Sequence, residues 1–152
     1  MNKLRRALPV AAACVAAALM ATTAFAATAD SSKVVIGAKA FAGSQGQGWG
    51  TTRPATLFNG GDPSGLISKI HWSSWGGKSA SGVGLNSIFK PHGGYYRKQV
   101  HIQLRGTDLG RCTAKGPLAY RKLMAREPSK PGGKDGKWFS WSGKKTLCKP
   151  GF

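Results

Sequence analysis

Acidic side chains are the first residues to weigh as catalysts. Most glycoside hydrolases place two carboxylates about 5–10 Å apart around the bond that is cleaved. Beyond its first 26 residues the chain has five carboxylates: Asp30, Asp62, Asp108, Glu127 and Asp135. Three of them lie close to glycine or proline in segments typical of turns, and Glu127 precedes Pro128 at the end of an expected strand. Turn chemistry therefore explains most of these residues, and a catalytic pair brought together by folding is the alternative.

Nucleophilic, metal and nucleotide chemistry have weaker signals in this chain. Ser64 lies in the turn sequence Asp-Pro-Ser-Gly, which does not resemble a nucleophile elbow. His71, His92 and His101 would bind zinc only if the fold brought them together with supporting partners. The glycine-rich segment 43–50 lacks the lysine and the strand-to-helix setting of a phosphate-binding loop. We therefore expect no cofactor and no metal, and these patterns favour a protein that is not an enzyme.

Aromatic residues beside cations are the remaining pattern with a chemical use. Aromatic faces stack on sugar rings or bases, and neighbouring cations hold phosphates or uronates. Trp138 and Trp141 lie three residues apart, which places them on opposite faces of a strand and predicts that one is exposed. The candidate ligand-binding residues are Trp75, Lys137, Trp138, Trp141, Lys144 and Lys145. The alternative is that the tryptophans pack in the core while the lysines only solvate the surface.

The charge of the chain supports a role for these cations. Lys and Arg number 23 against five Asp and Glu, and the formal net charge is +18. Such a field attracts anionic polymers, which outside a cell include teichoic acids, acidic polysaccharides, DNA and membrane surfaces. A general bias of basic exported proteins toward solubility is the competing explanation.

Short apolar runs separated by turn signals predict the elements that position these residues. They indicate an all-β fold, a small single-domain antiparallel β-sandwich or barrel. Residues 99–105 alternate most clearly, with Val100, Ile102 and Leu104 facing inward. Residues 116–127 are compatible with a helix or a strand, and a strand is favoured. The other expected strands are residues 33–41, 52–59, 66–75, 79–89, 137–142 and 145–149, the last two as a hairpin.

Residues 70–84, with the sequence IHWSSWGGKSASGVG, are predicted to form a hairpin around a glycine turn. Period-two alternation places Trp72 with the aliphatic residues of its strand and therefore in the core. The same alternation places Trp75 beside Lys69 and His71, which predicts that Trp75 is exposed. Small residues in the returning strand leave room beside the tryptophans.

The first 26 residues match a signal peptide, with a basic start and a long apolar run that ends in Ala-Phe-Ala. We expect cleavage before Ala27, and cleavage after Ala29 or retention as a membrane anchor are the alternatives. Secretion to the extracellular space and a single domain over residues 27–152 follow from this interpretation. No membrane-spanning segment is then expected in the cleaved protein.

The cysteines agree with export. Cys14 lies within the apolar leader and would be removed with it, which leaves Cys112 and Cys148. An even number of cysteines in an exported protein predicts one disulfide. Two free thiols, or half of a metal site, are the alternative.

Several motifs occur in a characteristic order: an early Arg-Pro, a DPSG turn, the WSSWG hairpin, and an alternating strand that leads to a cysteine. In this order the chain resembles small exported, uncharacterised actinobacterial proteins with a signal peptide and a predicted β-sandwich. The resemblance covers residues 53–148. It implies a β-sandwich and assigns no functional residue.

Together these observations predict a secreted, monomeric, non-enzymatic binding protein. Its partner would be an anionic polymer of the cell envelope or extracellular space, held by a cationic surface that carries tryptophan. One alternative is a secreted effector directed at a protein partner, an inhibitor or antibacterial toxin acting through the basic loop 128–136. Another is an enzyme with an unfamiliar site.

Overall fold

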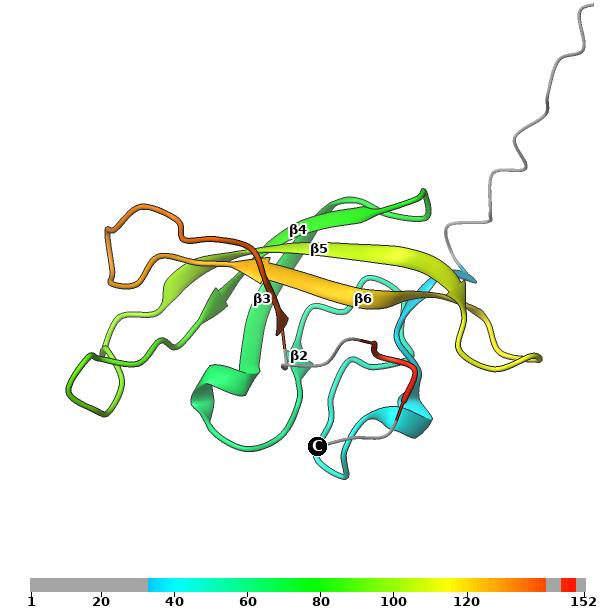
Figure 1. The fold of residues 1–152 in the computed structure, drawn as a ribbon, viewed down its shortest axis with the longest axis horizontal. Helices are drawn as coiled ribbons and strands as arrows, with labels where there is room; N and C mark the ends of the chain where they lie inside the picture. Colours follow the sequence, from blue (N-terminus) through cyan, green and yellow to red (C-terminus); the bar gives the residue numbers. More distant parts are fainter. Residues whose placement is uncertain (1–32, 142–145, 150–152) are drawn as a thin grey trace, which may run out of the picture.

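Seven strands form one sheet in the computed structural model, which describes residues 33–141 and 146–149. The strand order is β1-β6-β5-β4-β3-β2, and β7 also pairs with β6. The bounds are β1 Val35–Ile36, β2 Leu57–Phe58, β3 Leu66–Ser74, β4 Ala80–Asn86, β5 Val100–Arg111, β6 Leu118–Arg126 and β7 Phe139–Ser140. The sheet curls into a half-barrel, which confirms the all-β prediction (Figure 1). Within the described residues no helix is long and apolar enough to cross a membrane. The predicted leader, residues 1–26, lies outside them.

The centre of the sheet follows the sequence pattern closely. On β5, Val100, Ile102 and Leu104 are buried and the residues between them face outward, as predicted. Residues 118–126 form the strand β6, which confirms the strand prediction. Apolar side chains at every second position thus place one face of β5 against the core and leave the other to solvent. We call this solvent side of β4, β5 and β6 the outer face.

The predicted hairpin is formed by β3 and β4, but its faces differ from the prediction. Ile67 and Ile70 are both buried, and the pairing of β3 with β4 shifts register between Ser68 and His71 and again between Trp72 and Ser74. Each irregularity changes which face the following residues occupy. The prediction that Trp75 is exposed is therefore wrong, since only 8% of it is accessible.

Hydrogen bonds and ring contacts hold the two tryptophans of this hairpin in place. The Trp75 indole N–H donates to the carbonyl of Val34 at 3.0 Å, and that of Trp72 donates to the carbonyl of Pro54 at 2.9 Å. The two indoles meet edge to face at 4.7 Å, and Trp72 is half-buried against the core. Opposite Trp72 stands Gly82, whose missing side chain leaves the predicted room for the indole.

The segments before β3 form less strand than expected. Of residues 33–41 only β1 is a strand, because Gly37 takes a positive φ and the chain then enters the 3-10 turn η2, Lys39–Phe41. Of residues 52–59 only β2 is a strand, since Arg53 has a φ of 45° and Pro54 has no N–H to donate. Both short strands lie at edges of the sheet path, β1 beside β6 and β2 beside β3.

The described part of the carboxyl-terminal segment also differs from the predicted hairpin, and residues 142–145 of that prediction lie outside the described residues. β7 pairs with β6, and residues 146–149 form a turn whose Leu147 N–H donates to the carbonyl of Arg121 at 2.7 Å. The predicted disulfide joins Cys112, directly after β5, to Cys148, with their Cα atoms 4.9 Å apart. It therefore fastens the last described segment to the end of the longest strand.

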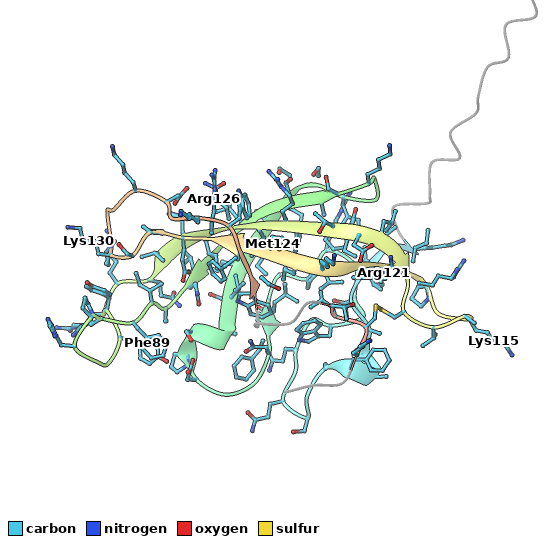
Figure 2. The ribbon with its side chains drawn as sticks, viewed as in Figure 1. Phe89, Lys115, Arg121, Met124, Arg126 and Lys130 are labelled. Atoms are coloured by element: carbon cyan, nitrogen blue, oxygen red, sulfur yellow. A yellow bond between two sulfur atoms is a disulfide. The ribbon has the colours of Figure 1, made fainter. Side chains whose placement is uncertain are left out.

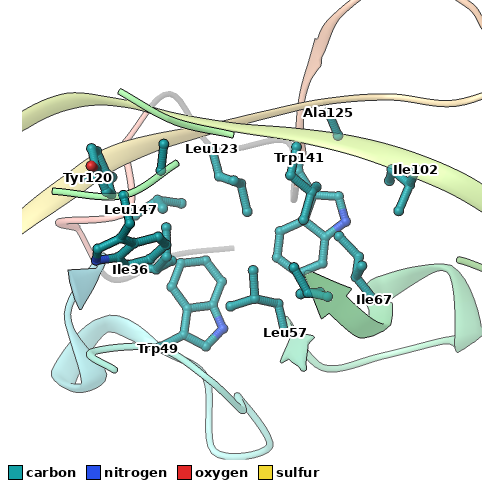
Figure 3. Close-up of a cluster of buried hydrophobic side chains, with 14 of the residues drawn as sticks. Ile36, Trp49, Leu57, Ile67, Ile102, Tyr120, Leu123, Ala125, Trp141 and Leu147 are labelled. Atoms are coloured by element: carbon teal, nitrogen blue, oxygen red, sulfur yellow. The ribbon is translucent and has the colours of Figure 1, made fainter. Parts of the chain in front are cut away.

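Side chains from distant segments fill the concave side of the sheet (Figure 3). Trp49 comes from a glycine-rich loop, yet it is buried and its ring stacks at 6.0 Å on Trp141. Trp141 lies between Leu123 of β6 and Leu57 of β2 in this view. Loops thus cover the inner face of the half-barrel and bury its apolar side chains, as a second sheet does in a sandwich.

Candidate functional site

The outer face carries a cluster of cations around one indole ring. Alternation turns Gln103 and Arg105 of β5 outward, and register places Arg126 of β6 opposite Gln103 and Met124 opposite Arg105. Phe139 of β7 pairs with Ala125, which is buried, so both residues face the inner side of the sheet. Trp138, the residue before Phe139, therefore faces the outer side. Figure 2 shows Arg126 and Met124 on neighbouring parts of this surface.

Both guanidinium groups lie over the Trp138 ring. The Cζ atom of Arg105 is 4.7 Å from the ring centroid, and that of Arg126 is 5.0 Å away. A cation over an indole is attracted by the negative face of the ring, by about 0.5–1 kcal/mol at exposed sites. The indole therefore holds close together two positive charges that would otherwise repel. We call Arg105, Arg126 and Trp138 the arginine–tryptophan cluster.

A chain of hydrogen bonds orients one of the two arginines. Arg126 donates from Nε and Nη2 to Oε1 of Gln103, at 3.1 and 2.9 Å. Gln103 in turn donates from Nε2 to Oδ2 of Asp135 at 2.6 Å, and Arg126 Nε lies 3.9 Å from the same oxygen. Arg105 has no acidic side chain within ion-pair distance among the described residues. The carboxylate of Asp135 thus lies near Arg126 and not near Arg105, and an excess of positive charge remains on this face.

This arrangement has the chemistry of an anion site. A guanidinium group presents planar pairs of N–H donors that match phosphate and carboxylate oxygens. Arg105 is exposed and keeps its donors available to a ligand, while the indole edge can contact an apolar part of it. Lys137, the residue before Trp138 in the chain, is also exposed.

The structure places the predicted site residues in different environments. The half-buried Trp138 belongs to the arginine–tryptophan cluster, and the exposed Lys137 precedes it in the chain. Trp141 was expected to bind the ligand, but it is 3% accessible and stacks on Trp49, so its ring face is not available to a polymer. Trp75 is buried for the reason given above. Lys144 and Lys145 lie outside the described residues.

Sequence reasoning missed Arg105, Arg126 and Gln103. A signal for them existed, because the alternation of residues 99–105 already pointed Arg105 outward. Nothing in the sequence paired that position with Trp138, 33 residues later. The contact depends on the pairing of β7 with β6, which the prediction of a final hairpin did not include.

The carboxylates have mostly structural partners. Asp62 accepts from the backbone N–H of Ser64 at 2.9 Å and so caps η3, Pro63–Gly65, as its turn setting predicted. Asp108 forms a 2.6 Å ion pair with Arg121. Glu127 differs, since its partner is the amide of Asn86 at 2.8 Å, in a separate groove described below.

The histidines are only partly brought together. His71 and His101 line the same small hollow of about 240 Å³ on the outer face, and His92 is exposed in the loop between β4 and β5. Within residues 33–141 and 146–149, no three His, Cys, Asp or Glu side chains are placed to hold a metal ion.

Comparison with known proteins does not assign this site. No protein-family model, curated protein or solved structure matches the chain.

Proposed function

We propose that the protein is an exported, non-enzymatic binding protein whose outer face contacts an anionic polymer of the cell envelope or extracellular space. The observation that carries the proposal is the placement of Arg105 and Arg126 over the single Trp138 ring. Two guanidinium groups with one nearby carboxylate favour a ligand that brings negative charge. The edge of the indole adds a surface for an apolar part of that ligand.

Further cations on the same sheet favour a polymer over a small anion. Lys122 of β6 is exposed and pairs with Thr107 of β5, two positions along from Arg105 on the outer face. Lys137, in the loop before β7, is another exposed cation. A chain with repeated phosphates or uronates would engage these positions in succession, and each contact would make binding more dependent on salt.

The test is co-sedimentation of the purified protein with cell-wall sacculi, prepared with and without their anionic polymers, across a salt series. The proposal predicts pelleting at low salt that falls steeply as salt rises and disappears when the anionic polymers are removed. An amount of pelleted protein that changes neither with salt nor with removal of the anionic polymers would contradict the proposal. Binding that resists salt and needs a protein partner would favour an effector acting through loop 128–136.

Matched variants connect the binding to the cluster. Arg105→Gln removes one exposed guanidinium and should weaken binding about tenfold, the usual effect of losing a charge-assisted hydrogen bond. Lys115→Gln removes the same charge from an exposed loop at the far end of the sheet (Figure 2) and should leave binding nearly unchanged. Equal losses in the two variants would mean that only net charge matters and that the cluster has no special role.

A further inference from the structure

A groove of about 970 Å³ lies on the inner side of the sheet, away from the arginine–tryptophan cluster. It is bordered by the loops at 43–45 and 59–65, the end of β4 with residues 88–89, Glu127 after β6, and β7 with Trp141. Alternation separates the two surfaces. Arg126 and Trp138 face outward, and the next residues, Glu127 and Phe139, line the groove.

Exposed aromatic side chains mark this groove. Three large hydrophobic side chains are exposed among the described residues, and two of them, Phe89 at 53% and Phe139 at 40%, line it. Phe89 packs on Tyr95 at 4.4 Å between ring centroids, which holds its ring in place. In Figure 2 Phe89 projects on the side of the molecule where η3 lies. Exposed apolar rings gathered at a concavity are typical of a binding site.

The polar side chains that line the groove carry carboxylate, amide and hydroxyl groups. Asn86 is 2% accessible, and its Nδ2 donates to Oε2 of Glu127 at 2.8 Å, which fixes the direction of that carboxyl group. Burial raises the pKa of Glu127, and the hydrogen bond from Asn86 acts in the opposite direction without cancelling the rise. Asp62 lines the groove too, and its hydrogen bond with the Ser64 hydroxyl lowers the pKa of that carboxyl. One carboxyl is thus desolvated and the other is solvated.

Charge narrows the class of ligand. None of the described residues that line the groove is Lys, Arg or His, although the whole chain has 23 Lys and Arg. The two carboxylates repel anions, and the net charge of +18 disfavours the approach of cations. An uncharged ligand with many hydroxyl groups satisfies both conditions. Its ring faces would stack on Phe89 and Phe139, and its hydroxyls would donate to the carboxylate and amide oxygens.

We propose that this groove is a binding site for an uncharged saccharide chain, separate from the outer face. The proposal stands on the groove, its exposed phenylalanines, the Asn86–Glu127 pair and the lack of cations among its described residues. It goes beyond the proposed function and does not depend on it. A protein with both sites would bind the acidic groups of an envelope polymer on its outer face and a neutral glycan in the groove.

Calorimetric titration with neutral oligosaccharides tests this site directly. The probes are hexasaccharides of N-acetylglucosamine, of β-linked glucose and of α-linked glucose, with a polyphosphate of similar length as the anionic comparison. The proposal predicts saturable binding of at least one hexasaccharide with little dependence on salt. The absence of heat from all three hexasaccharides at millimolar concentration would overturn it, and so would displacement of a bound hexasaccharide by polyphosphate.

Variants place that binding in the groove. Phe89→Ala and Glu127→Gln should each weaken saccharide binding, by about 3- to 10-fold and about 10-fold, because they remove a stacking ring and a charged acceptor. Val83→Ala removes an exposed hydrophobic side chain outside the groove and serves as the control. Arg105→Gln should weaken pelleting with anionic polymers and leave saccharide binding intact, so the two proposals can fail separately. Equal binding by all four variants would overturn the groove assignment.

Discussion

The side-chain amide of Asn86 donates a 2.8 Å hydrogen bond to the carboxyl group of Glu127, 41 residues away. The bond joins the last residue of β4 to the residue that follows β6, across the intervening strand β5. It places a desolvated carboxyl group in the groove of a strongly basic protein. The stability of the protein should therefore respond to the protonation of this one residue.

The pH dependence has a definite sign. Burial raises the pKa of Glu127 above its usual value of 4.5, so the folded protein binds this proton more tightly than the unfolded chain does. The contribution of Glu127 to the free energy of unfolding therefore falls as pH rises from about 4.5 through the folded-state pKa. Glu127→Gln removes this loss and should be at least as stable as the parent at pH 7, with the difference shrinking below about pH 4. Urea unfolding at several pH values measures this, and a variant less stable only at neutral pH would contradict it.

The two tryptophans near β7 should behave differently on truncation. Trp141→Ala opens a cavity in the core and should lower the free energy of unfolding by about 3–5 kcal/mol. Trp138→Ala removes a half-buried ring on the outer face and should cost about 1–2 kcal/mol, mostly through its contacts with the two arginines. Urea unfolding of the pair tests the assignment of one ring to the core and the other to the surface. A larger loss in Trp138→Ala would show that assignment to be wrong.

Gly82 should tolerate no side chain. A Cβ atom there would lie 2.9 Å from Cε3 of Trp72 and 3.0 Å from the carbonyl oxygen of His71. Gly82→Ala should therefore cost about 1–3 kcal/mol through overpacking. In Gly77→Ala, the control in the adjacent turn, the nearest atom would be the carbonyl oxygen of Ser79 at 4.0 Å, and little change is expected. Similar urea midpoints for the two variants would refute the close approach.

The disulfide should contribute strongly to stability. It closes a loop with a sequence separation of 36 residues, worth about 4 kcal/mol in the chain-entropy model. The double variant Cys112→Ser, Cys148→Ser should lose about that much in urea unfolding, and dithiothreitol should lower the parent to the same level. The reductant should leave the double variant unchanged. A parent that is insensitive to dithiothreitol while its disulfide is reduced would count against this role.

Local sequence patterns were sufficient for some elements. The alternation of Val100, Ile102 and Leu104 predicted the buried face of β5, because side chains in a strand point to the same face at every second residue. The glycine turn predicted the β3–β4 hairpin, and two cysteines in the predicted mature chain left one possible disulfide. The small residues opposite Trp72 also followed from the sequence. In each case the signal lies within a few residues or in a simple count.

Tertiary structure decided which rings are buried and which charges meet. Register shifts in β3 moved Trp75 into the core, and no period in the sequence shows where a strand will bulge. Trp138 meets Arg105 only because β7 folds back along β6, and Glu127 meets Asn86 only across β5. The sequence by itself thus determined the fold class, the central strands and the covalent link. The two candidate sites depend on pairing between segments far apart in the chain, which is set by how the whole sheet buries its apolar face.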